Sequence, residues 1–225
     1  MACHIMDPAY MSLKLVEAPE FSVEMIMEKG SNSQTFPIMS TVKYSFPARG
    51  DMAPVDVYWY DGHSPCLLAT EENKYPGHWP KPELDEHYNR PKRPEGVSED
   101  EVLGDNNQNG SFFVGDKGVL TAGEYGGNPR IITGDKMEGY EYPEQTIERI
   151  PGESPYFDWI RGCKGEQEPC SSFNYAGPFT EMVQFGNLVV KSGKKLVWDN
   201  VKGEVKNAPK DIVTKEYRKG WELPC

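Results

Sequence analysis

The chain has 225 residues, of which 37% are hydrophobic and 26% charged, enough for one substantial core or at most two small ones. No stretch approaches the roughly 18 consecutive apolar residues of a membrane span. The formal net charge of −11 argues against binding to nucleic acid or to an anionic membrane surface, because both need a positive protein face. The five cysteines are odd in number and irregularly spaced, which favours reduced thiols over a disulfide framework. This composition favours the cytoplasm and leaves export open.

The first part of the chain predicts one helix followed by strands. Residues 1–11 are apolar and dense in large side chains, as at the entry to a buried helix. Asp7 before Pro8 is typical of a helix start, and the helix is expected to reach about Leu15. Apolar and polar residues then alternate with a period of two, which predicts strands with one buried face at 21–29, 38–46 and 55–60.

Residues 61–109 have a different character. They hold six prolines, many charges and little periodicity, which predicts a long irregular excursion serving as a lid, an interface arm or a partly disordered segment. Three histidines and one cysteine in this excursion match no zinc spacing, so surface histidines are favoured over a metal site. These residues are His63, Cys66, His78 and His87.

The second half predicts a hairpin and then mostly helices. A turn at 115–118 joins strands at 111–114 and 119–123. Helices are expected from Ser154 to about Gly165, from Asn174 to Gly193 and over 207–219, with a strand at 196–198. Consecutive strands followed by helices indicate an α+β fold. We expect an open, largely antiparallel (mixed) β-sheet with helices on one face.

Several blocks, in a consistent order, resemble one enzyme family. They lie at residues 44–51, 113–118, 158–165, 170–178, 186–188, 192–196 and 216–221. Together they closely resemble the C-terminal half of bacterial Gfo/Idh/MocA-type oxidoreductases, the family of glucose–fructose oxidoreductase and inositol dehydrogenase. The similarity covers nearly the whole chain, and residues 61–109 contribute least to it.

The resemblance implies that two domains bind the cofactor and the substrate separately. In this family an N-terminal Rossmann domain binds NAD or NADP, and a C-terminal domain supplies an open sheet, part of the substrate pocket and the oligomer interface. No G-x-G-x-x-G sequence follows a strand here, and 123–127 is too short to serve. We therefore expect residues 1–225 to form a single C-terminal domain without a Rossmann domain, bound cofactor or redox turnover of its own.

The resemblance also assigns candidate site residues. The opening segment is similar to the family's Asp-x-x-x-His segment, with His4 as the catalytic histidine, Asp7 as the following carboxylate and the motif's first Asp falling just before Met1. An imidazole can take the hydroxyl proton of a sugar, and a neighbouring carboxylate can fix its tautomer. On the residues alone, a packed histidine and a helix-capping aspartate are the alternatives. Tyr10 is expected to line the sugar site or the core, and Arg130 to contact substrate or form an ion pair.

Two functions of different class follow from these observations. The first is the substrate-binding domain of an NAD(P)-dependent oxidoreductase acting on a sugar or polyol. A redox-neutral variant of that chemistry, such as hydrolysis through a keto intermediate, would also need bound NAD. The second is a free-standing carbohydrate-binding or oligomeric assembly module without catalysis. Aromatic residues on both sides of one strand, Tyr58, Trp59 and Tyr60, suggest that both sheet faces are covered and predict a homo-oligomer through the open sheet.

Overall fold

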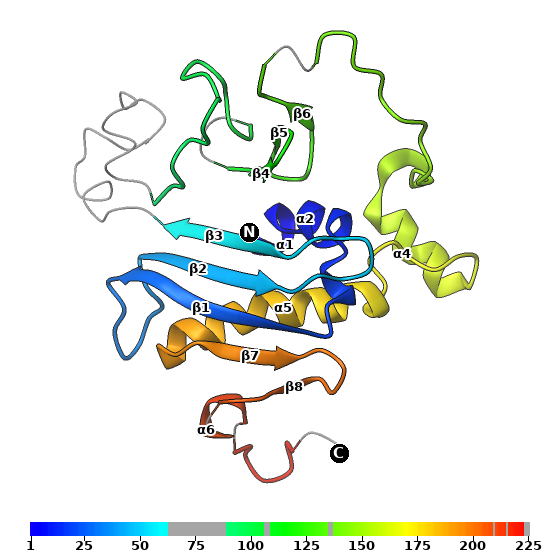
Figure 1. Ribbon diagram of the computed structural model, residues 1–225. Helices are drawn as coiled ribbons and strands as arrows, with labels where there is room; N and C mark the ends of the chain where they lie inside the picture. Colours follow the sequence, from blue (N-terminus) through cyan, green and yellow to red (C-terminus); the bar gives the residue numbers. More distant parts are fainter. Residues whose placement is uncertain (63–88, 106–108, 135–136, 209, 215, 223–225) are drawn as a thin grey trace, which may run out of the picture. The chain divides into compact units, whose positions relative to one another are not determined.

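The computed structural model describes residues 1–62, 89–105, 109–134, 137–208, 210–214 and 216–222 (Figure 1). His63, Cys66, His78 and His87 lie outside the described residues, as does most of the excursion predicted at 61–109. The chain divides into two compact units: residues 1–10 with 93–182, called unit 1, and residues 11–92 with 183–225, called unit 2. The fold is α+β, as the sequence predicted. The prediction of a single domain stays a prediction.

The helices and strands follow the predicted order over most of the chain. The helices are α1 (Ala2–Ile5), α2 (Asp7–Ser12), α4 (Pro155–Lys164), α5 (Phe173–Ser192) and α6 (Lys210–Val213). The strands are β1 (Glu20–Lys29), β2 (Met39–Phe46), β3 (Val55–Gly62), β4 (Ser111–Gly115), β5 (Gly118–Ala122), β6 (Arg130–Ile131), β7 (Leu196–Asp199) and β8 (Glu204–Val205). Among the described helices, none is both long and apolar enough to span a membrane.

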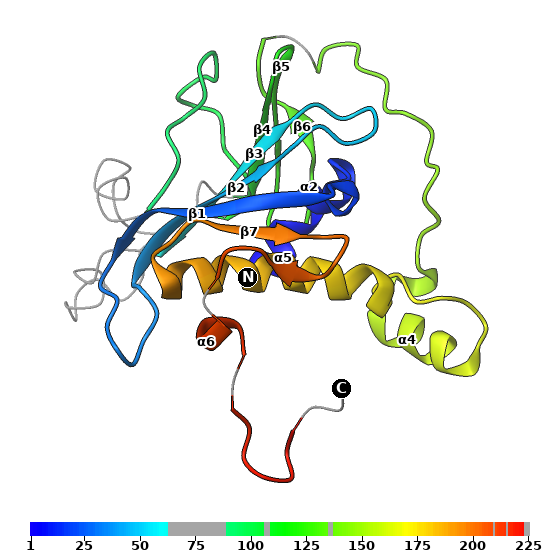
Figure 2. The same cartoon turned by 60° about the horizontal axis from the view of Figure 1, so that its bottom comes forward.

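Unit 2 contains a five-stranded antiparallel sheet in the order β3-β2-β1-β7-β8. The C-terminal part of α5 covers one face of it, as Figure 2 shows. Phe185 of α5 makes an edge contact with Phe21, their ring centroids 5.7 Å apart. A Cβ atom on Gly186 would lie only 2.0 Å from the Tyr44 hydroxyl oxygen, so the helix approaches the sheet closely because this residue is glycine. Leu196 and Val189 are completely buried in this contact layer.

The outward face of the same sheet carries charges of alternating sign beside the stacked rings of Tyr58 and Tyr60. Lys195 forms an ion pair with Glu24 at 3.6 Å, and Glu24 is the cross-strand neighbour of Lys43. Lys43 in turn lies 3.0 Å from Asp56 and 5.6 Å from the centre of the Tyr58 ring. Paired charges of this kind stay solvated at little cost. The homo-oligomer predicted through this face stays a prediction.

Unit 1 contains a second, three-stranded sheet in the order β4-β5-β6. Strands β4 and β5 form the predicted hairpin around the turn. We expected one open sheet, and the structure separates this hairpin from the five-stranded sheet. Thr121 of β5 joins the hairpin to the segment that precedes it. Its fully buried hydroxyl accepts a hydrogen bond from the Gly104 amide at 2.8 Å and donates one to the Ser111 carbonyl at 2.9 Å. A small core of Val97, Val119 and Ile132 lies beside it.

The C-terminal segment departs from the prediction of a helix over 207–219. Within the described residues this segment holds only α6, of four residues. The side chain of Asn207 accepts a hydrogen bond from the Val197 amide at 2.9 Å and donates one to the Lys195 carbonyl at 3.0 Å. These bonds hold the start of the segment against β7, and β8 pairs with the same strand. The predicted helix is therefore present in part and shorter than expected, and the bonds of Asn207 to β7 account for its later start.

Candidate functional site

Asp7 and Tyr175 form the polar centre of the candidate site in unit 1. The Tyr175 hydroxyl donates a hydrogen bond of 2.5 Å to Oδ1 of Asp7, across 168 positions of sequence. Asp7 is the first residue of α2, where Pro8 follows in the position that helix starts favour. Burial raises the pKa of Tyr175, and the bond to Asp7 adds to that rise, so the phenol stays protonated at neutral pH. Tyr175 is therefore a fixed donor that orients the Asp7 carboxylate.

Tyr10 lies beside this pair, one helical turn after Asp7. Its ring packs against Phe179 at a centroid distance of 4.7 Å and meets Tyr175 edge-on at 5.5 Å. The side chain is 3% exposed, yet its hydroxyl oxygen has no hydrogen-bond partner within the described part of the chain. Burial raises the pKa of Tyr10 to about 12, with further contributions from the charges of Glu181 and Asp7. A buried hydroxyl left unpaired is costly, which makes this group the least satisfied part of the cluster.

His4 occupies the rim of the same segment, next to a glycine-rich turn. Its exposed ring contacts that of Tyr125 at 5.0 Å, with the ring planes inclined by 69°. The turn is closed by a hydrogen bond from the Gly123 amide to the Gly127 carbonyl. Gly126 adopts a left-handed φ of +72°, and a Cβ there would lie 2.8 Å from Pro8. The turn thus packs on the start of α2 because it lacks side chains at that point.

Within the described part of the chain, the polar contacts of Arg130 are with residues other than His4, Asp7, Tyr10 and Tyr175. Its guanidinium lies 3.4 Å from the Glu101 carboxylate and donates a short hydrogen bond to the Val102 carbonyl. The Asn128 carbonyl accepts a further bond from it at 3.4 Å. The ion pair, which was one of the two alternatives for Arg130, is thus present in the structure. Its role as a substrate-binding residue stays a prediction.

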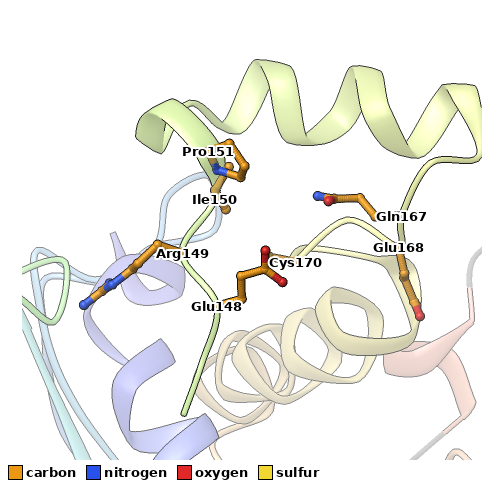
Figure 3. A pocket seen from close by; sticks show the side chains of 7 residues that line it. All are labelled: Glu148, Arg149, Ile150, Pro151, Gln167, Glu168 and Cys170. Carbon is orange, nitrogen blue, oxygen red and sulfur yellow. The ribbon is translucent and has the colours of Figure 1, made fainter. Parts of the chain in front are cut away.

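The structure also contains an open cleft of about 170 Å³ elsewhere in unit 1, shown in Figure 3. It is lined by Glu148, Arg149, Ile150, Pro151, Gln167, Glu168 and Cys170. Asp158 of α4 organises one wall, because its buried carboxylate accepts from Gln167 Nε2 at 2.7 Å and from the Cys170 amide at 2.9 Å. None of the four predicted site residues lines this cleft. It therefore gives no support to the predicted chemistry.

The structure thus brings together Asp7 and Tyr10 and places His4 on the preceding turn, α1. It adds Tyr175 and Tyr125, which sequence reasoning missed. Tyr175 lies within block 170–178 of the family resemblance, but no spacing in the sequence links it to Asp7. Such a pairing is visible only once the start of the chain is packed against α5. The described residues include no group of three or more His, Cys, Asp or Glu side chains that could hold a metal ion.

Fold and site together define an α+β protein in which a half-buried pair, Asp7 and Tyr175, lies against the buried ring of Tyr10. Comparisons with protein-family models, with curated proteins and with solved structures found no match. The functional argument therefore depends on the chemistry of the cluster and on the sequence resemblance.

The described residues do not fit a dinucleotide fingerprint. Its glycines must lie between a parallel strand and the start of a helix, where amides and helix dipole meet the pyrophosphate. Here the glycine run 123–127 joins β5 to β6, two strands of an antiparallel sheet. Gly126 also packs against Pro8, so its backbone does not face an open phosphate site. No step of the chemistry is therefore assigned to a nicotinamide cofactor on this chain.

Proposed function

We propose that this chain is the sugar- or polyol-binding domain of an NAD(P)-dependent oxidoreductase of the Gfo/Idh/MocA type. The observation that carries the proposal is the cluster of Asp7, Tyr175 and the unpaired hydroxyl of Tyr10. A polyol presents several hydroxyl groups, each able to donate and to accept. A carboxylate and a buried phenol side by side complement such a ligand.

Each residue has a distinct role in this proposal. Asp7, oriented by Tyr175, accepts a hydrogen bond from a substrate hydroxyl. Tyr10 supplies a hydroxyl donor that has no hydrogen-bond partner within the described residues. His4, accessible to solvent, takes the proton of the hydroxyl that becomes a carbonyl and returns it in the reverse reaction. NAD or NADP belongs on the Rossmann domain of the complete enzyme, and the isolated chain has no redox turnover.

Titration calorimetry with a panel of hexoses and inositols tests this proposal. The chain should bind at least one of them, and Tyr10→Phe and Asp7→Asn should each weaken binding about tenfold, the value of one hydrogen bond to a charged or buried partner. Tyr58→Phe, on the outward sheet face, is the matched control and should leave the affinity unchanged. Binding as tight as that of the parent chain in both the Asp7→Asn and the Tyr10→Phe variant would contradict the assignment of the site. Micromolar binding of NAD(H) to the chain alone would contradict the proposal that the cofactor binds to a separate Rossmann domain.

The alternative is a carbohydrate-binding or oligomeric assembly module without catalysis, which uses the same cluster and needs no proton transfer by the exposed His4. It shares the binding result and differs in the role of His4. Mixing the chain with a separately expressed Rossmann partner and following NADH formation separates the two. Turnover that is lost in His4→Ala supports the enzyme domain, whereas ligand binding without turnover supports the module.

A further inference from the structure

Helix α4 carries an apolar stripe on its solvent side. Tyr156, Trp159, Ile160 and Cys163 are spaced i, i+3, i+4 and i+7, which places them on one face of a helix. Tyr156 is 78% exposed, Trp159 66% and Ile160 38%, and the Cys163 thiol is also exposed. The apolar face of this helix therefore points outward. An exposed apolar stripe of this kind is typical of an interaction surface.

The opposite side of α4 is held to its own unit through Asp158 and Gly162, while Phe157, between that side and the stripe, is 59% exposed. Asp158, only 3% exposed, holds the loop 166–170 through its bonds to Gln167 and Cys170. One turn later, a Cβ on Gly162 would lie 2.4 Å from Pro169 Cγ, so the loop packs directly on the helix backbone. These contacts fix which side of α4 faces inward. Rotating the helix to bury the stripe would break the bonds of a buried carboxylate.

We propose that the stripe pairs with the α4 stripe of a second copy of this chain, antiparallel about a two-fold axis. In that arrangement Tyr156 lies opposite Cys163 of the second copy, and Trp159 opposite its Ile160. Each two-fold interface is self-complementary in this way. The pairing is independent of the proposed sugar site, since no residue of the stripe belongs to it.

Charge also favours the antiparallel pairing. Glu153 precedes the helix, and Lys164, which also lies 3.9 Å from Glu166 of its own copy, is its last residue. Antiparallel packing brings the acidic end of one helix to the basic end of the other, and it aligns the two helix dipoles favourably. A parallel pairing would set like charges against each other at both ends.

The size of the stripe sets the strength expected of this dimer. A buried Tyr or Trp contributes about 150–250 Å². With the smaller Ile160 and Cys163, two stripes cover roughly 1,000 Å² in total, the lower limit of specific interfaces. We therefore infer a reversible dimer with a dissociation constant in the micromolar range.

Sedimentation equilibrium of the intact chain over a concentration series tests the pairing. A monomer–dimer equilibrium is expected, and Trp159→Glu should raise the dissociation constant at least about 30-fold, as at a central hot spot. Tyr58→Glu on the outward sheet face is the control and should leave association unchanged. A chain that is monomeric throughout, or a dimer lost in Tyr58→Glu and retained in Trp159→Glu, overturns the proposal. The second result would place the interface on the sheet.

A crosslink tests the antiparallel register. In the Tyr156→Cys variant the new thiol should lie opposite Cys163 of the second copy. Glutathione disulfide should then oxidise the two thiols to an intermolecular disulfide while being reduced to two glutathione thiols. A covalent dimer on a non-reducing gel that disappears when Cys163→Ser is added supports the register. A covalent dimer that persists in the double variant, or none at all, contradicts it.

Discussion

The outward face of the five-stranded sheet and the outward face of α4 expose different kinds of side chain to solvent. On the sheet, the outward positions carry paired charges such as Lys43 and Asp56, and the apolar residues lie beneath α5. On α4, Asp158 is buried and Trp159 is exposed. The comparison shows that side-chain periodicity identifies an amphipathic helix or strand but does not show which of its two faces is buried in the core. Burial partners elsewhere in the chain decide that.

The largest expected effect is the difference in unfolding free energy between a substitution beneath the sheet and one on the α4 stripe. Leu196 is fully buried in unit 2, so Leu196→Ala should lower the free energy of unfolding by about 2–5 kcal/mol through lost transfer energy and a cavity. Trp159→Ser removes a larger side chain but should change it by no more than about 0.5 kcal/mol. Urea unfolding followed by circular dichroism, at a protein concentration low enough to keep the chain monomeric, measures both. Comparable losses in the two variants would mean that the α4 stripe is buried after all.

A second effect tests why α4 has this orientation. Asp158→Ala removes the acceptor of the Cys170 amide and the Gln167 side chain, and should cost about 1–3 kcal/mol. Asp158→Asn keeps one carbonyl oxygen and should cost less. Hydrogen exchange of the Cys170 amide should speed up in the alanine variant. Unchanged exchange there would show that another group holds the loop.

The sequence predicted β1, β2 and β3 well because a half-buried strand alternates with a period of two, a pattern that β2, β3 and the part of β1 before its bulge at Met25–Met27 keep, whereas the two-residue β8 was not predicted. It predicted α4 for a local reason, Ser154-Pro155 at the start and Gly165 at the end. It could not show that the α4 stripe faces outward, because the Asp158 contacts form only after the loop folds back. In the same way, Asp7 was found from the resemblance, whereas Tyr175 required the packing of unit 1.

A third prediction uses two glycines of the same helix. Gly186→Ala forces a Cβ to within 2.0 Å of the Tyr44 hydroxyl and should destabilise the chain by about 1–2 kcal/mol. Gly177→Ala meets no atom within 4 Å beyond its chain neighbours, but Pro178 follows it and disfavours a Cβ in the helical conformation, so the gain in helix propensity should be offset and the stability should change little. Thermal unfolding compares the pair, and adding Tyr44→Phe should restore part of the loss at Gly186. If both alanine variants are as stable as the parent chain, α5 does not approach the sheet as closely as described.

The smallest effect concerns the charges on the outward sheet face. The hydrogen bond from Ser45 lowers the pKa of Asp56, and Lys43 lowers it further. Because the folded-state pKa is the lower one, Asp56 contributes stability above its unfolded pKa of about 3.9 and loses that contribution as the pH falls through the folded value. The side chain is largely solvated, so the contribution should be about 0.5 kcal/mol or less. Asp56→Asn should therefore match the parent chain at pH 2.5 and be slightly less stable at pH 7, as measured by urea unfolding at both pH values. A difference at pH 7 well above that size would mean that this face is desolvated, as an interface would be, and would favour oligomerisation through the sheet over pairing through α4.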